Sequence, residues 1–262
     1  MKNKDWKVIV AACAVAMAGA WGPASASAAD SGEAKDKPAL YTYEASWAIP
    51  RAKWADYEKS GAGTSKVLDQ AISSGAIVAY GNDSDLIHTA DGSTHDDWWS
   101  ALSEAGVLNT LDAIYKAGGG TSPALTSATK HWDNLFVSHH YGWHPGSWKG
   151  AYTHWSTYNL KPDAPNDAVS TIAKVFVEPL MEKLLADGTI VEYEIDEEAI
   201  HTENPDLFAI SYITTTAEGL DKAQAALRDA AKKTPLIGPA MDGMVDFTKH
   251  RDGLTRTTAT YK

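Results

Sequence analysis

Two segments of the chain have nearly the same sequence, and this repeat constrains the fold more than any other feature. Residues 75–89 read GAIVAYGNDSDLIHT, and residues 188–202 read GTIVEYEIDEEAIHT. They align without a gap at an offset of 113 residues, and a weaker match keeps the same offset as far as Ala117 and Ala230. A repeat of this extent predicts that one supersecondary unit occurs twice.

The residue patterns around the repeat predict the same order of elements in both copies. Apolar and polar residues alternate over 41–49 and 152–160, which indicates a half-buried strand, and a helix in two pieces follows each. The repeated segment then forms a strand that turns and returns. A helix and a final strand complete each copy, the strands covering 135–141 and 244–248. The order β-α-β-β-α-β is that of the ferredoxin-like unit.

The predicted fold class is α+β, with tandem ferredoxin-like βαββαβ repeats whose antiparallel sheets pack into one α/β barrel. Residues 40–148 are assigned to the first repeat and residues 149–262 to the second. Each sheet covers one face with its two helices and leaves the other face bare, so packing the two bare faces together buries both. A fused pair can do this as a monomer, and a homodimer is the alternative.

The first 29 residues have the features of a secretory signal peptide. Lysines precede an apolar run of roughly 14 residues, and A-x-A cleavage sites follow within 24–29. The run is short for a transmembrane helix, so we expect no membrane insertion and a secreted or periplasmic protein. Residues 30–39 have the composition of a flexible leader. A lipoprotein signal ending at Cys13 is a competing interpretation.

Composition excludes several kinds of chemistry. Cys13 is the only cysteine, so the chain after the signal peptide has neither disulfides nor thiolate ligands. The formal net charge of −11 argues against nucleic acid as a partner. The acidic run over 192–198 is expected to be a solvated strand face, because it lacks the glycine-punctuated spacing of a known calcium loop.

Aromatic and histidine residues are concentrated in the first copy. Eight of the ten tryptophans lie between Trp47 and Trp155, and seven of the nine histidines precede residue 156. The densest region, 131–155, spans the last strand of the first copy, a turn and the first strand of the second. A ligand site is therefore expected between the first sheet and this hairpin.

Three interpretations of this aromatic region remain open: a packed core, a pocket for a small apolar or aromatic molecule, and a metal site. His139 and His140 point to opposite faces of a regular strand, and other pairs such as His95 with Asp97 are common by chance, so no metal or cofactor is predicted. The candidate ligand-binding residues are Trp98, Trp99, Asn134, Tyr141, Trp143, His144 and Trp155. Any of His139, His140 and His95 could act as a general base.

The duplicated units resemble the dimeric α/β-barrel superfamily, which includes antibiotic-biosynthesis monooxygenases and chlorite-dismutase-like haem proteins. The resemblance rests on topology and duplication. It implies an exported small-molecule-binding barrel, or a cofactor-independent monooxygenase-like or isomerase-like enzyme with a histidine base. A haem-binding chlorite-dismutase-like protein is an alternative, although helices 166–186 and 217–233 contain no axial histidine. A non-enzymatic exported binding or interaction module is the third possibility.

Overall fold

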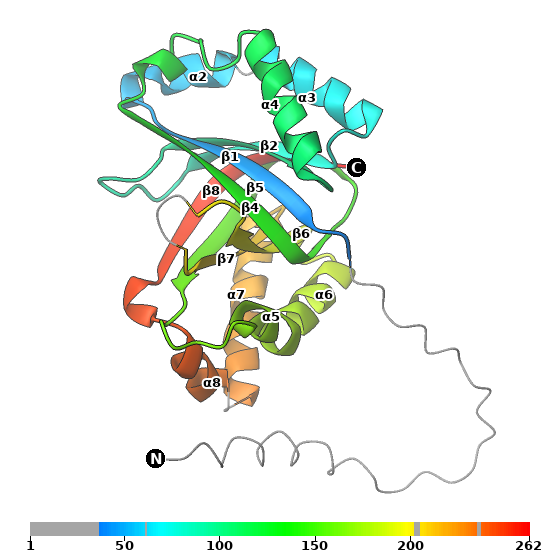
Figure 1. The fold of residues 1–262 in the computed structure, drawn as a ribbon, viewed down its shortest axis with the longest axis vertical. Coiled ribbons are helices and arrows are strands. Elements are labelled where there is room, and N and C mark those ends of the chain that lie inside the picture. The colour runs from blue at the N-terminus through cyan, green and yellow to red at the C-terminus, as the bar shows by residue number, and fades with distance from the viewer. Residues whose placement is uncertain (1–36, 61, 202–204, 235–236) are drawn as a thin grey trace, which may run out of the picture. The chain divides into compact units, whose positions relative to one another are not determined.

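The chain folds into one closed antiparallel barrel of eight strands in the computed structural model (Figure 1). The structure describes residues 37–60, 62–201, 205–234 and 237–262. The predicted signal peptide and most of the predicted leader lie outside these residues. Among the helices in these ranges, none is long and apolar enough to cross a membrane.

The strands are shared equally between the two halves of the chain. They are β1 (Leu40–Ala48), β2 (Ala79–Asp85), β3 (His95–Ala101), β4 (Lys130–Trp143), β5 (Gly146–Asn159), β6 (Glu192–Glu198), β7 (Leu207–Thr214) and β8 (Arg251–Tyr261). The order around the barrel is β1-β3-β2-β8-β5-β7-β6-β4, with β4 closing on β1. Strands of one half therefore stay adjacent, and the halves join at two seams, β2–β8 and β4–β6. The predicted fold class is confirmed.

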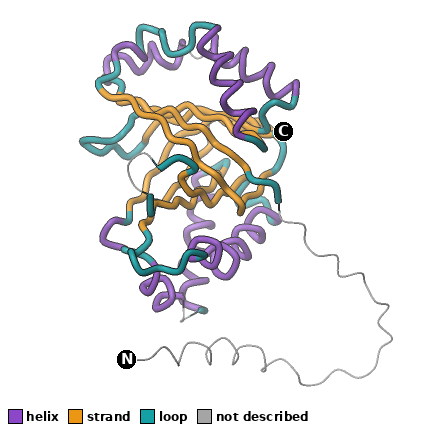
Figure 2. The backbone as a smooth tube through the Cα atoms, viewed as in Figure 1, coloured by secondary structure: helices purple, strands orange, loops and turns teal. Residues whose placement is uncertain are grey.

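The helices lie outside the barrel, in two groups on opposite sides (Figure 2). The first half contributes η1 (Arg51–Lys53), α2 (Trp54–Ser60), α3 (Ala62–Ser74), α4 (Glu104–Lys116) and η2 (Leu125–Ser127). The second half contributes α5 (Ala168–Ile172), the π-helical segment η3 (Ala173–Val177), α6 (Glu178–Ala186), α7 (Ala217–Lys233), α8 (Ile237–Met244) and η4 (Phe247–Lys249).

Apolar side chains on the outer faces of the strands form separate cores beneath the two helix groups. On one side, Trp99 and Leu135 pack with Val107 and Ile114 of α4. On the other side, Tyr193 and Tyr212 pack with residues of α6 and α7. The helices thus use the outer faces of the strands, and the inner faces are left to form the interior of the barrel.

One predicted element was wrong. A final strand was expected over 244–248, but Met244 ends α8, and only Val245 makes an isolated bridge, to Leu160. The apolar residues here pack with α5 instead of extending a sheet. The strand is β8, in which small and hydroxyl-bearing residues face the interior and give a weak apolar pattern.

Side chains from both halves fill one end of the barrel interior. Trp98 and Tyr261 have ring centroids 5.8 Å apart, and Val191 and Ile213 pack with them. Gly81 makes room for this packing, because a Cβ atom there would lie 2.4 Å from the Trp98 ring. This closed end fixes the floor of the space described next.

Candidate functional site

The remaining interior of the barrel is a cavity of about 630 Å³. Its floor includes Trp98 and Tyr261, and aromatic rings from three further positions, Trp132, Phe136 and Trp155, line its walls. Ile87 and Arg251 are exposed and also line the cavity, so its mouth lies beside the β2–β3 connection and the start of β8. A space of this size suits a small organic molecule.

Eight carboxyl groups also line this cavity. They come from β1, β2, β3, β6 and β8, and are Glu44, Asp83, Asp85, Asp96, Glu192, Glu194, Asp196 and, exposed beside Arg251, Asp252. Arg251 at the mouth is the only lysine or arginine among the described lining residues, and its side chain is exposed. The interior therefore has a large excess of acidic over basic groups.

Several of these carboxyl groups accept hydrogen bonds from neighbouring side chains. Asp83 Oδ2 accepts from the indole Nε1 of Trp98 at 3.1 Å, and Glu194 Oε2 accepts from the Thr42 hydroxyl at 3.3 Å. The hydroxyl of Ser138 donates to Asp196. These bonds hold carboxyl groups from both halves in fixed positions on the wall.

Three carboxyl oxygens at the cavity have no hydrogen-bond partner among the described residues. They are Oδ1 of Asp83, Oδ1 of Asp96 and Oε1 of Glu192. Their residues are deeply buried, with exposed fractions of 9%, 7% and 2%. Buried polar atoms in folded proteins are nearly always paired, so three unpaired acceptors around one cavity need a physical explanation.

Burial raises the pKa of the interior carboxyl groups. The pKa of Glu192 is well above its usual range, first because of burial and then because Glu194, Asp196 and Asp83 are close. Burial also raises the pKa of Asp83 to about 6. The pKa of Glu44 is raised to about 7, by burial and then by Asp83. The groups therefore influence one another across a shared space.

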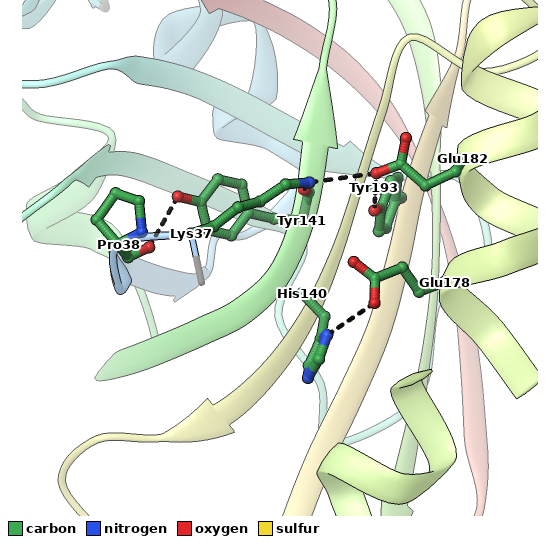
Figure 3. Close-up of polar contacts among 7 residues, drawn as sticks. All are labelled: Lys37, Pro38, His140, Tyr141, Glu178, Glu182 and Tyr193. Atoms are coloured by element: carbon green, nitrogen blue, oxygen red, sulfur yellow. Dashed lines mark hydrogen bonds and ion pairs between the residues drawn. The ribbon is translucent and has the colours of Figure 1, made fainter. Parts of the chain in front are cut away.

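The candidate histidine bases lie outside the residues that line the cavity. His95 packs on the outer side beneath α2, with its ring 4.4 Å from that of Tyr57, and burial lowers its pKa to about 4. The Nδ1 atom of His140 lies 3.1 Å from Glu178 Oε2 on α6 (Figure 3). His139 is exposed.

An irregularity in β4 explains where these two histidines point. The pairing of β4 with β6 shifts between Ser138 and His140, so His139 is the additional residue of a bulge. Ser138 bonds the interior carboxyl of Asp196, whereas His140 faces α6. Because the bulge reverses the alternation of the strand, the regular pattern assumed from the sequence does not hold here.

The candidate ligand-binding residues divide into three groups. Trp98, Asn134 and Trp155 line the cavity. Tyr141 and Trp143 stack with centroids 5.4 Å apart, and Trp143 packs against the closed end. Trp99 and His144 lie elsewhere: Trp99 faces α4, and the exposed His144 bonds the Leu185 carbonyl at 2.8 Å.

The sequence interpretation missed the acidic wall of the cavity. The run over 192–198 was expected to face solvent, but Glu192, Glu194, Asp196 and Glu198 are buried, and only Glu197 is exposed. The signal was present, because these four residues alternate with Tyr193 and Ile195, which pack under the helices. In a closed barrel the face opposite the helices is the interior.

The described residues do not fit a haem site. No histidine is among those that line the cavity, so an axial imidazole ligand is missing from the wall. The eight carboxyl groups would also repel the propionates of a haem. Within the described ranges, no group of three histidine, aspartate or glutamate side chains is arranged to hold a metal ion.

The chain is similar in fold to known proteins, and this similarity does not establish its function. No family model matches the chain, and no curated protein matches it. A candidate monooxygenase of Lactobacillus acidophilus has a similar structure, with a TM-score of 0.60 and 12% identity over 86% of this chain and 97% of that one. A candidate monooxygenase of Fusobacterium nucleatum gives a TM-score of 0.57 and 8% identity, over 86% and 94%. Both likenesses concern the barrel alone.

Proposed function

We propose that this α/β-barrel protein binds a small organic molecule with an aromatic or apolar body inside the barrel. The cavity of about 630 Å³ carries the proposal, because it combines a packed aromatic floor with an open mouth. The barrel closes within one chain, so a single copy is enough to build the site whether the protein is a monomer or a homodimer.

The interior carboxyl groups support proton transfer as a second candidate function. Burial raises the pKa of both Glu44 and Asp85 to about 7, where a group can accept and return a proton near neutral pH. These two residues line the cavity, whereas the three candidate histidines do not. A cofactor-independent reaction here would use a carboxylate as base and would appear as conversion of the bound molecule.

The binding proposal can be tested with three compounds that share a naphthalene ring and differ in the group that ends the side arm, which is an ammonium, a hydroxyl or a carboxylate. They are 2-(1-naphthyl)ethylamine, 2-(1-naphthyl)ethanol and 1-naphthaleneacetate, titrated by calorimetry at pH 8. We expect at least one to bind with 1:1 stoichiometry. Ala209→Trp fills part of the cavity and should weaken that binding at least about tenfold, because the ligand loses the space it occupies.

A matched control distinguishes filling the cavity from adding an indole ring to the surface. Glu197 is exposed on β6, and its backbone pairs with Phe208, next to Ala209. Glu197→Trp should bind as the unaltered protein does. If none of the three compounds binds, or if Ala209→Trp binds as tightly as the control, the proposed site is wrong.

We also propose that the protein is exported, with residues 1–29 removed as a signal peptide. The mass of the chain recovered from cells that produce the complete sequence should equal that of a chain beginning after Ala26, Ala28 or Ala29. In cell fractionation, the chain should be recovered in the medium or the periplasmic fraction. If the folded protein recovered from these cells still carries residues 1–29, this proposal is wrong.

A further inference from the structure

The charge on the cavity wall selects among the molecules that the proposed function allows. Eight carboxyl groups line the cavity, and the single arginine of the described lining is exposed at the mouth. Gathering like charges in a poorly solvated space is unfavourable unless a cation joins them or they take up protons. The wall thus offers a place for positive charge.

The positions of the acidic residues make this arrangement stand out from an ordinary barrel core. Asp83 and Asp96 are directly paired neighbours on β2 and β3, and like charges placed opposite one another destabilise a sheet. Small apolar side chains could fill such positions without this penalty. The pairing is therefore a sign that the interior is built for something other than stability.

The second observation is the set of unpaired oxygens, which points to a missing donor. Oε1 of Glu192, Oδ1 of Asp96 and Oδ1 of Asp83 are buried at the cavity without a partner among the described residues. An ammonium group has three N–H donors and no acceptor, which suits a site that has acceptors in excess. Charge-assisted hydrogen bonds of this kind are the stronger ones.

Aromatic rings in the same cavity complete the recognition of a molecular cation. Trp98 lies at the floor beside Asp83, and Trp132, Phe136 and Trp155 supply faces on the walls. Aromatic faces attract cations and also cover apolar carbon. A bare metal ion fits less well, because no metal-ligating group of three side chains occurs in the described part of the chain.

We propose that the ligand of this barrel is an organic ammonium ion, whose charged end lies among the buried carboxyl groups of the cavity wall and whose aromatic or apolar body packs on the tryptophans. This inference rests on the proposed function and adds the charge class of the ligand.

The three naphthalene compounds test this charge class directly. At pH 8 the amine should bind at least about tenfold more tightly than the alcohol, and the carboxylate should bind more weakly than the alcohol. Glu192→Gln should reduce the ratio of amine to alcohol affinity by about tenfold and leave the alcohol affinity nearly unchanged. Asp96→Asn should act in the same direction, and provides a second variant if the first does not fold.

Glu197→Gln is the control, because it removes a carboxyl group from the exposed outer side of the same strand. It should keep the preference for the amine. Equal binding of amine and alcohol, or a preference that survives both Glu192→Gln and Asp96→Asn, would overturn the ammonium inference while the proposed function stands. If none of the three compounds binds, the proposed function fails and the inference fails with it.

Discussion

Raising the pH from 5 to 8 should lower the free energy of unfolding of the ligand-free protein by at least about 3 kcal/mol. The pKa of buried Asp83 rises from 3.8 to about 6, so between pH 5 and pH 8 this group alone should lower the free energy of unfolding by about 1.4 kcal/mol. Asp196, Glu44 and Asp85 are shifted in the same direction, to between about 6 and about 7. Their effects are not additive, because each protonation eases the next.

The sign follows from proton binding. A carboxyl group with a raised pKa keeps its proton in the folded state at a pH where the unfolded chain has lost it. The stability it contributes is therefore present at low pH and is lost as the pH rises from about 4 to about 7. Urea unfolding at pH 5, 6, 7 and 8 measures this directly.

A pair of variants assigns the effect to the cavity. Glu192→Gln removes a buried carboxyl whose pKa is raised, so it should stabilise the protein at pH 8 and flatten the dependence on pH. Glu197→Gln, on the exposed side of the same strand, should leave the curve unchanged. Equal unfolding free energies at pH 5 and pH 8 would mean that the interior groups are solvated well enough to keep ordinary pKa values.

The adjacent tryptophans of β3 should respond very differently to replacement by alanine. Trp99 is 3% exposed, stacks on Tyr43 with centroids 4.6 Å apart, and donates to the Val107 carbonyl at 3.1 Å. Trp99→Ala should lower the free energy of unfolding by about 3–5 kcal/mol, the usual range for a buried tryptophan. It should leave the affinity of the folded protein for a naphthalene ligand within about twofold, because the ring lies outside the cavity.

Trp98→Ala also removes a buried ring, but this one forms part of the floor of the cavity. It should weaken ligand binding at least about tenfold at a temperature where the variant is still folded. Tyr212, which occupies the Trp99 position in the second repeat and is 2% exposed, provides the control. Tyr212→Ala should behave like Trp99→Ala. Calorimetry on folded samples separates the two outcomes, and equal loss of affinity in all three variants would contradict the assignment of the cavity.

The sequence was sufficient for the order of elements because local patterns reflect it. Glycine at positions 75 and 188 is an example, since both residues have positive φ and follow α3 and α6. The repeated offset then indicated two copies of one unit. The first signal is carried by neighbouring residues and the second by the comparison of two segments of the sequence, so neither requires knowledge of distant contacts.

The site was harder to predict because it depends on which face of each strand is inside. Trp98 and Trp99 are adjacent residues of the same type, but Trp98 faces the cavity and Trp99 faces the core outside the barrel. The bulge at His139 changes the orientation of β4 in the middle of the strand. The acidic residues of β6 look solvated in isolation, and only the closure of the barrel buries them. Residue types therefore indicated which side chains could form a site, but the orientation of each side chain in the barrel determines which of them line the cavity.

The seam between β2 and β8 also has a consequence for how the chain is made. It joins residues 79–85 to residues 255–261, which are the last of the described strands to be synthesised. Until β8 exists, β2 and β5 each lack a neighbour and expose an edge that can pair with another chain. Closing so large a loop is slow, because distant contacts must form together. The nascent chain is thus most vulnerable to aggregation just before its final strand is complete.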